Sequence, residues 1–323
     1  MARPPELPFR RSDVVRQGVT DTVLAGWVAS GQVRRVFHGV YVPTRFPDTL
    51  KLRAACARLI LPQHCVVVER SAAWLHGIDL HSPDERFIVP DLEVVSLPGH
   101  NRVRRAGVYG ASRDLKDADI TQVGDVPVTT PLRTALDLAC LRGVPDALTT
   151  LDSFMRTYGV TQLEMTAQLP RYHRRRGVVQ LRRLVPLASP LAESPGESWT
   201  RALLIEAGFP APTLQIEFTE QGRLVARADL GYPQLRIAIE YFGDEFHGPD
   251  HEQDDRDRIA WMVERGWHVI VVRKEDLRGA AREAWLAELA AVIAERTLPR
   301  GKRRYPRGQA LAGWERRSSS ASL

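Results

Sequence analysis

The stretch RLVARADLGYPQLRIAIEYFGDEFH, residues 223–247, predicts the fold of the C-terminal part of this 323-residue chain. Two runs rich in Val, Ile and Leu flank residues 233–236 (PQLR), where Pro and its polar neighbours interrupt the strand pattern. The pattern predicts a β-hairpin. A turn centred on those four residues places Asp229 directly opposite Glu240, on one face of the hairpin.

Carboxylates that face each other across a hairpin lie about 5 Å apart at Cβ and repel unless a proton or a cation lies between them. Mg²⁺ suits such a pair, because it accepts few carboxylates and keeps its waters and a substrate phosphate. The sequence therefore predicts a site for Mg²⁺, or Mn²⁺, at Asp229 and Glu240. The alternative is that Asp229 belongs to a surface turn and Glu240 to a solvated strand face.

The chain as a whole is long enough for two or three domains, each with its own core. A formal net charge of +6, with 44% hydrophobic and 26% charged residues, indicates a globular protein that is compatible with a polyanionic partner. Cys56, Cys65 and Cys140 have no CxxC spacing, so neither a disulfide framework nor a structural zinc site is expected. The sequence has no long apolar run and no signal-peptide pattern, and we expect a cytoplasmic protein without a membrane partner.

Residues 1–82 are predicted to form a winged-helix module that binds DNA. Two short helices, within RSDVVRQG and TDTVLAGWVASGQ, precede the strand pair VRRVFHGVYVP, which bends at Gly39. In a winged helix the second helix enters the major groove and the ribbon lies along the DNA backbone. We therefore expect Arg34, Arg35 and His38 to face phosphates. The alternative is a helical hairpin whose ribbon only covers a core.

The rest of the chain divides into three segments, and the fold class is α+β. Residues 83–188 begin with the strand candidates RFIVP, LEVVSL, AGVYG and DVPVT and continue with helices, the first of them PLRTALDLACLRG. The charged run RYHRRR, residues 171–176, is predicted to be a solvated helix end or, alternatively, a phosphate-contacting patch. Residues 189–298 have the order α, β, β-hairpin, α, β, α, which predicts an α/β sandwich. Residues 299–323 form a basic, Ser-rich tail that we expect to be disordered.

Two sets of motifs resemble known families. Glu197, on the first helix of the C-terminal segment, precedes Asp229, Glu240, Gly243 and His247, and this order resembles the PD-(D/E)XK nuclease fold. The blocks ESPGES, RADLGYP, IAIEYFGDEFH, DRDR and ERGWHVIVV are similar to the DUF559 branch related to very-short-patch-repair endonucleases. Upstream, GQVRRVFHGVYV and TTPLRTALDLA resemble the AbiE-type antitoxins of type IV toxin–antitoxin systems, whose N-terminal module is a winged helix.

The nuclease resemblance implies a restriction-endonuclease-like C-terminal domain with a role for each acidic residue. Asp229 and Glu240 would hold Mg²⁺ against the scissile phosphate, and Glu197 would complete the metal shell through a water. His247 would protonate the leaving oxygen or hold the attacking water; alternatively it is a histidine of a surface loop.

Two further positions bear on this implied site. Arg258 would contact a DNA phosphate or, alternatively, form an ion pair with Asp254 or Asp255. Two residues after Glu240 the broad fold usually carries Lys and the DUF559 branch Asp, whereas this chain has Phe242. Because an aromatic ring neither ligates a cation nor orients a water, this departure puts catalysis in doubt.

Two functions follow from these patterns. The first is a Mg²⁺-dependent endodeoxyribonuclease that docks on DNA through its winged helix and hydrolyses phosphodiester bonds. The second is a non-catalytic, antitoxin-like transcriptional autoregulator with a degenerate nuclease fold. DNA is the expected partner in both. Both functions also allow a homodimer and a toxin partner.

Overall fold

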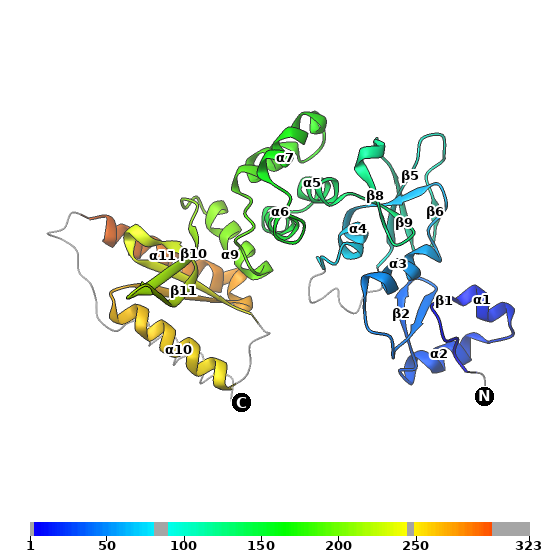
Figure 1. The fold of residues 1–323 in the computed structure, drawn as a ribbon, viewed down its shortest axis with the longest axis horizontal. Coiled ribbons are helices and arrows are strands. Elements are labelled where there is room, and N and C mark those ends of the chain that lie inside the picture. The colour runs from blue at the N-terminus through cyan, green and yellow to red at the C-terminus, as the bar shows by residue number, and fades with distance from the viewer. Residues whose placement is uncertain (1–2, 81–89, 244–248, 299–323) are drawn as a thin grey trace. The chain divides into compact units, whose positions relative to one another are not determined.

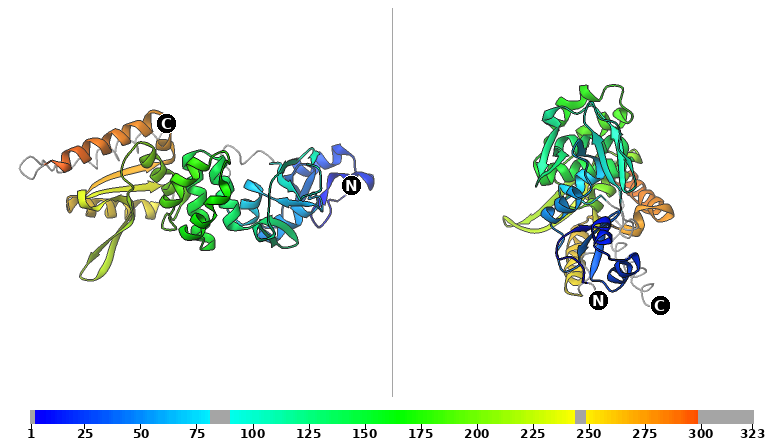
Figure 2. Two further views of the ribbon diagram at one scale, coloured as in Figure 1. Left: turned by 90° about the horizontal axis from the view of Figure 1, so that it is seen from above. Right: turned by 90° about the vertical axis from the view of Figure 1, so that its right-hand side faces the viewer.

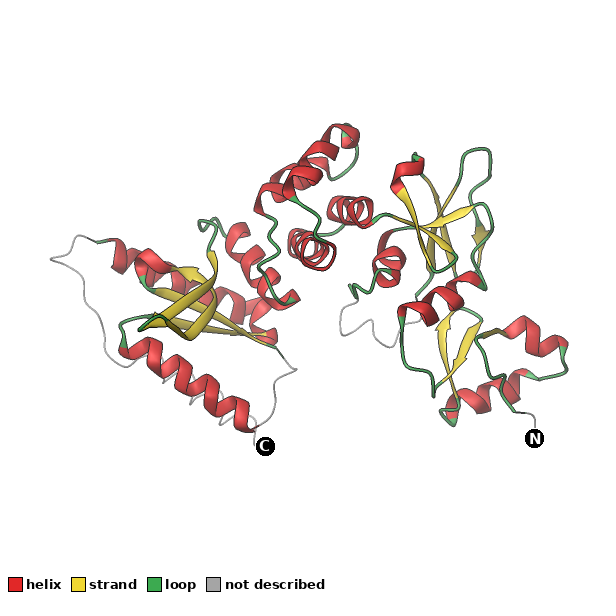
Figure 3. Ribbon diagram, in the orientation of Figure 1, coloured by secondary structure: helices red, strands yellow, loops and turns green. Residues whose placement is uncertain are grey.

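The computed structural model describes residues 3–80, 90–243 and 249–298, which divide into two compact units (Figure 1). The first unit falls within residues 1–141 and 160–181, and the second falls within residues 142–159 and 182–323. Both units combine helices with β-sheets (Figure 3), which confirms the predicted α+β class. Among the described residues, no helix has both the length and the apolar character needed to cross a membrane.

The N-terminal module starts with a short strand and two helices and ends with a β-ribbon. Its elements are β1 (Phe9–Arg10), α1 (Arg11–Arg16), α2 (Asp21–Ala29), β2 (Val33–Phe37) and β3 (Val40–Pro43). The strands form an antiparallel sheet in the order β1-β3-β2. Thr20 caps α2, because its hydroxyl accepts a hydrogen bond from Val23 N at 3.3 Å. The predicted order of helix, helix and ribbon is therefore confirmed.

A six-stranded mixed sheet follows, in the order β6-β7-β5-β4-β9-β8. Its elements and the helices between them are α3 (Leu50–Arg58), β4 (Cys65–Val67), α4 (Glu69–Leu75), β5 (Leu92–Ser96), β6 (Arg104–Arg105), β7 (Val108–Ser112), β8 (Ile120–Val123) and β9 (Val126–Thr129). Three of the four predicted strands correspond to β5, β7 and β9, whereas most of RFIVP lies outside the described residues.

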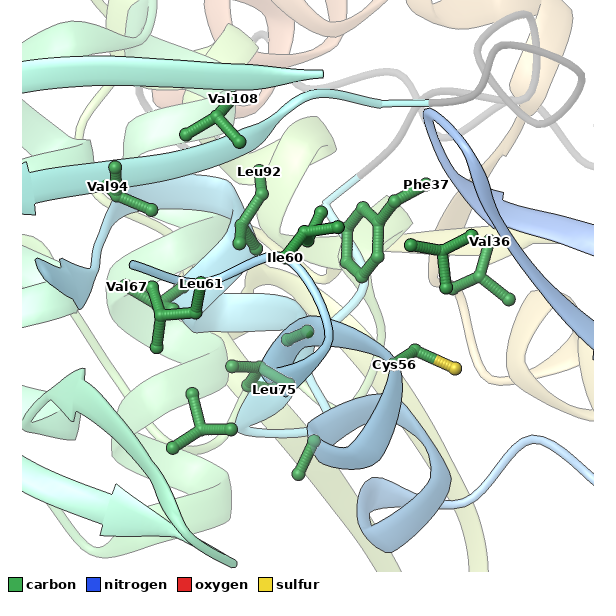
Figure 4. Close-up of a cluster of buried hydrophobic side chains, with 14 of the residues drawn as sticks. Val36, Phe37, Cys56, Ile60, Leu61, Val67, Leu75, Leu92, Val94 and Val108 are labelled. Atoms are coloured by element: carbon green, nitrogen blue, oxygen red, sulfur yellow. The ribbon is translucent and has the colours of Figure 1, made fainter. Parts of the chain in front are cut away.

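One hydrophobic core joins the N-terminal ribbon to this sheet. Phe37 of β2, Cys56 of α3, Leu75 of α4 and Leu92 of β5 are buried in the same cluster (Figure 4). β4, which precedes residue 82, pairs with β5 and β9, which follow it. The predicted boundary between residues 82 and 83 thus falls within a shared core and a shared sheet.

Three helices complete the first unit, and a buried carboxylate lies among them. They are α5 (Pro131–Leu141), α7 (Gln162–Gln168) and the start of α8 (Val178–Leu184). Asp137 of α5 has no exposed surface. Its oxygens accept hydrogen bonds from Arg133 Nε at 2.9 Å, Arg113 Nη1 at 2.7 Å, Arg175 Nη1 at 2.6 Å and Tyr172 Oη at 2.7 Å.

The network around Asp137 also explains the run RYHRRR. Arg175 bonds Asp137, and Arg171 Nη2 donates to Asp119 Oδ2 at 2.6 Å, so two arginines of the run are structural. Burial raises the pKa of Asp137, but the charges of Arg175, Arg133 and Arg113 outweigh it, and the pKa lies below the ordinary value. The Asp137 carboxylate is therefore ionised, and the surrounding guanidinium groups compensate its charge.

The second unit is an α/β sandwich around a four-stranded sheet in the order β10-β11-β12-β13. Its elements are α6 (Val144–Tyr158), α9 (Pro195–Glu206), β10 (Thr213–Glu220), β11 (Arg223–Tyr232), β12 (Ile237–Phe242), α10 (Pro249–Glu264), β13 (His268–Arg273) and α11 (Gly279–Thr297). Helices α9 and α11 cover one face of the sheet and α10 covers the other (Figure 1). Leu204 and Trp285 pack on the first face, and Met262 packs with Ala238 on the second. β10 and β11 project from this sheet as a long hairpin (Figure 2).

The β11–β12 hairpin has the register that the sequence predicts. Leu230 pairs with Ile239, Gly231 with Ala238 and Tyr232 with Ile237, and the same register brings Asp229 level with Glu240. The turn is a short 3-10 helix, Pro233–Leu235, followed by Arg236 at φ +52°, in the left-handed region. β12 then pairs in parallel with β13, so the acidic strand lies inside the sheet.

Replacement of the buried carboxylate at position 137 should unfold the first unit more easily. We expect Asp137→Asn to lower the free energy of unfolding by about 3 kcal/mol or more, because three guanidinium groups then lose a buried counter-charge. Urea unfolding followed by circular dichroism measures the change. Asp117→Asn, at an exposed acid of the same unit, is the control and should change stability by less than about 0.5 kcal/mol. Equal stability of the two variants would contradict the role given to Asp137.

Candidate functional site

Three acidic side chains meet at one end of the hairpin in the second unit: Glu197 of α9, Asp229 of β11 and Glu240 of β12. Burial, and then the charge of Glu197, raise the pKa of Asp229 to about 7. Burial, and then the charge of Asp229, raise the pKa of Glu240 to about 8. Burial also raises the pKa of Glu197. The charge of Glu197 acts on Asp229 and Glu240, and the charge of Asp229 acts on Glu240, so these carboxylates are near neighbours.

β10 and β11 both reverse their faces at the level of this site. Leu214 and Leu230 pair with each other and pack toward α9 and α11, whereas the next pair, Ile216 and Ala228, packs toward α10. In a regular strand residues two apart share a face, so each strand turns over between these pairs. Gln215 lies at the turnover with φ +49°, which is unusual for a residue with a side chain.

The residue level with Gln215 is Asp229. The turnover brings Asp229 to the edge of the buried layer, where its Oδ2 accepts a hydrogen bond from Tyr241 N at 2.8 Å. Gln215 Nε2 donates to Glu197 Oε2 at 3.0 Å, which ties β10 to α9. Gln215 Oε1 is buried and makes no hydrogen bond within the described part of the chain. Sequence reasoning missed Gln215, because a polar residue between Leu214 and Ile216 follows the ordinary alternation of a strand and gives no signal.

The start of α9 is shaped to hold Glu197 against the sheet. The hydroxyl of Ser194 caps the helix by accepting from Glu197 N at 3.1 Å, and Pro195 occupies its first turn. Gly196 packs so closely on β12 that an added Cβ would lie 1.9 Å from Tyr241 Cε1. Glu197 Oε2 also accepts from Glu193 N at 2.8 Å. A side chain at position 196 would therefore require the ring of Tyr241 to move.

A buried ion pair fixes the other side of α9. Asp152 of α6 has no exposed surface, and its carboxylate accepts hydrogen bonds from Arg201 Nη2 and, at 2.8 Å, from Ser198 Oγ. Ser189 N, in the segment between the helices, donates to Asp152 Oδ1 at 2.8 Å. Burial raises the pKa of Asp152. Because Ser198 follows Glu197 directly, this pair helps to set the position of Glu197.

Arg258 of α10 pairs directly with the acidic site. Its Nη1 lies 3.0 Å from Glu240 Oε2, and its Nη2 lies 2.7 Å from Asp255 Oδ1. The same Nη1 donates to the carbonyl oxygen of Arg227 at 3.0 Å. The ion pair with Asp255 was one of the alternatives for Arg258, whereas the pair with Glu240 was not expected. Contact with a phosphate remains a prediction.

Whether this acidic site suits a divalent cation depends on which of its side-chain oxygens lack a hydrogen-bond partner. Glu240 is 1% exposed, and its Oε1 has no hydrogen-bond partner among the described residues. With Gln215 Oε1 this makes two buried oxygens without a donor beside Asp229 and Glu197, a set of hard ligands that Mg²⁺ or Mn²⁺ accepts. In the described ranges no group of three or more His, Cys, Asp or Glu side chains could hold a metal ion, so a cation here would depend on fewer protein carboxylates and on waters.

Two other residues of the predicted site, His247 and Phe242, contribute less to the geometry described above. His247 lies outside the described residues, which break off between 243 and 249. Phe242 is half-buried in the cluster under α10, and the guanidinium of Arg273 lies 5.6 Å from its ring centroid. This aromatic side chain therefore contributes packing at the position where the predicted nuclease resemblance implies a charged group.

The predicted DNA-binding residues lie on the ribbon of the first unit. Arg35 and His38 are exposed and adjacent, with 2.7 Å between Arg35 Nη2 and His38 Nδ1, while Arg34 is half-buried. α2 itself carries no Arg or Lys. Arg11, before it, pairs with Asp21 at 2.6 Å. Positive charge for phosphate contacts is thus available on β2 and the following turn.

Comparison with known proteins adds a family to this geometry. Uncharacterized protein MT2308 of Mycobacterium tuberculosis strain CDC 1551 / Oshkosh and Uncharacterized protein Rv2248 of strain H37Rv are each 31% identical to this chain over 256 residues. The similarity covers 78% of this chain and 89% of each relative. The chain belongs to the family of these mycobacterial proteins.

One segment of this family member is also similar to a described domain. Residues 65–187 match the AbiEi antitoxin C-terminal domain. The matched segment contains TTPLRTALDLA and so supports the antitoxin part of the predicted resemblance. GQVRRVFHGVYV precedes the match and the nuclease motifs follow it, so the match supports neither, and the nuclease resemblance stays a prediction.

The acidic site should make stability fall as the pH rises. The folded-state pKa values of Asp229 and Glu240, about 7 and 8, lie above their ordinary values, so the folded chain binds more protons in this range than the unfolded chain. Their contribution is complete below about pH 4 and is lost as the pH rises to about 8. We expect Asp229→Asn to exceed the wild-type chain in stability at about pH 9 by on the order of 1–3 kcal/mol, and by less at about pH 5.

Urea unfolding across this pH range measures the difference. Glu217→Gln, at an exposed acid of the same sheet, is the control and should follow the wild-type profile. Parallel profiles for Asp229→Asn and the wild-type chain would show that Asp229 is not desolvated in solution.

Proposed function

We propose that this chain is a DNA-binding antitoxin of the AbiEi type. The observation that carries the proposal is the match of residues 65–187 to the AbiEi antitoxin C-terminal domain, directly behind a module with the element order of a winged helix. In this role the module docks on DNA and the matched domain recognises a toxin. The exposed cluster of Arg35 and His38 supports the DNA part, because phosphate contacts require accessible cations.

DNA binding should depend on the ribbon arginines. We expect the double variant Arg34→Ala, Arg35→Ala to bind a duplex from upstream of its own gene about tenfold or more weakly, with a salt slope smaller by about one for each phosphate that the variant no longer neutralises. A gel shift at several salt concentrations measures both quantities. Arg58→Ala, at an exposed arginine of the same unit, is the control and should bind as the wild-type chain does. Unchanged affinity in the double variant would place the DNA surface elsewhere.

A second candidate function is metal-dependent hydrolysis of phosphodiester bonds by the C-terminal unit. It is favoured by one observation, the opposed acids Asp229 and Glu240 with a buried oxygen of Glu240 left free. A bound Mg²⁺ or Mn²⁺ would neutralise charge on a phosphate and lower the pKa of a bound water. The chain itself supplies the two carboxylates, holds Glu197 beside them through α9, and keeps Glu240 away from solvent. Phe242 counts against efficient catalysis.

Metal binding and cleavage can be tested separately. We expect Mn²⁺ to raise the melting temperature of the wild-type chain, because an ion that binds only the folded state stabilises it by about 2.7 kcal/mol at a hundred times its Kd. Asp229→Ala should lose this shift, and with it any Mn²⁺-dependent nicking of supercoiled plasmid DNA. A shift without nicking leaves a binding protein with a metal site. Nicking of equal rate in Asp229→Ala would reveal a contaminating nuclease.

A further inference from the structure

Arg258 connects the buried acids of the second unit to the protein surface. Its side chain is 28% exposed, whereas that of Glu240, 3.0 Å away, is 1% exposed. Two further contacts anchor the guanidinium on its outer side: Asp255, itself 29% exposed, and the carbonyl oxygen of Arg227. The arrangement places a fixed positive charge against the innermost carboxylate of the site.

The charges around Glu240 do not balance. Asp229, Asp255 and Glu197 are negative neighbours of Glu240, while Arg258 is its ion-pair partner among the described residues. Arg258 covers Glu240 Oε2, and Oε1 has no donor among the described residues. The guanidinium therefore compensates part of the charge that a divalent cation would compensate, and it does so from one side only.

We propose that Arg258 is an internal counter-ion that exchanges with a divalent cation at Glu240 and is then free to bind a DNA phosphate. This inference rests on the metal site of the second proposed function and adds a positioning residue to it. A divalent ion ligated by Glu240 repels a guanidinium at this distance, so the Arg258 to Glu240 pair weakens as the ion binds. Asp255 still holds the side chain at the rim of the site. The Nη1–H that pairs with Glu240 is then available to donate to a phosphate oxygen.

The exchange predicts two linked changes in affinity. Without the guanidinium the ion has no competitor, so Arg258→Met should bind Mn²⁺ between about 5-fold and 150-fold more tightly than the wild-type chain. In the wild-type chain Mn²⁺ should also strengthen binding of a DNA duplex, and by reciprocity the duplex should strengthen binding of Mn²⁺. Arg258→Met should lose most of this mutual effect, because the group that responds to both ligands is gone.

Isothermal titration with Mn²⁺, with and without a saturating duplex, measures both changes. Arg256→Met, at an exposed arginine of the same helix, is the matched control for the loss of one positive charge and should bind Mn²⁺ as the wild-type chain does. Arg258→Lys keeps the charge and should stay within about threefold of wild type. If Arg258→Met is too unstable for titration, a larger Mn²⁺-dependent rise in its melting temperature than in that of Arg258→Lys gives the same information.

The outcomes separate this inference from the function on which it rests. Tighter binding of Mn²⁺ by Arg258→Met alone supports the exchange. Equal or weaker binding by Arg258→Met, with clear binding by the wild-type chain, overturns the exchange and leaves the metal site in place. If Mn²⁺ binds neither the wild-type chain nor any variant, both the metal site and the exchange are wrong.

Discussion

Repulsion between buried carboxylates is the constraint on which the second unit depends. Asp229 and Glu240 are brought level by the register of one hairpin, and Glu197 is brought beside them by a helix. A fold that only needed stability would place apolar side chains here, because like charges without water cost free energy. The surrounding structure instead holds the acids together through a glycine contact at Gly196, a strand turnover at Gln215 and a buried ion pair behind α9.

The two units compensate buried charge in opposite ways. In the first unit, three guanidinium groups surround the single negative charge of Asp137, and the pKa of Asp137 lies below its ordinary value. In the second, Glu240 has one ion-pair partner among the described residues, Arg258, which it shares with Asp255, and the pKa values of Asp229 and Glu240 are raised. The first arrangement is that of a structural anchor, since nothing more needs to bind. The second leaves a deficit of positive charge, and perturbed acids of this kind are typical of sites that take a ligand.

The sequence predicts the parts that local chemistry decides. Pro233 and its polar neighbours give the hairpin turn and so the register of Asp229 and Glu240, and Thr20 marks the start of α2. The turnover at Gln215 could not be predicted, because a left-handed φ at a non-glycine residue is imposed by tertiary packing. The same holds for Arg258, whose pairing with Glu240 joins residues from a helix and a strand with no common periodicity.

The arginines of RYHRRR show a related limit of sequence reasoning. A dense positive run is usually solvated, yet Arg171 and Arg175 bond Asp119 and Asp137, which precede them by 52 and 38 residues. A charge pattern read along the chain does not reveal partners at such separations, and the core that joins β2 to β5 crosses a predicted boundary for the same reason. A run of arginines in the sequence thus does not show which of their side chains are accessible to DNA.

The ion pair between α6 and α9 has a consequence for how this protein can be divided. Asp152 lies inside the stretch that matches the antitoxin domain, but Arg201 and Ser198 lie beyond its end at residue 187. A fragment cut at that end would retain Asp152 without Arg201 and would leave uncovered the face of α6 that packs on α9. The matched segment therefore lacks part of the packing around α6, and a substitution at Arg201 would call for a matching change on the inner surface of α6.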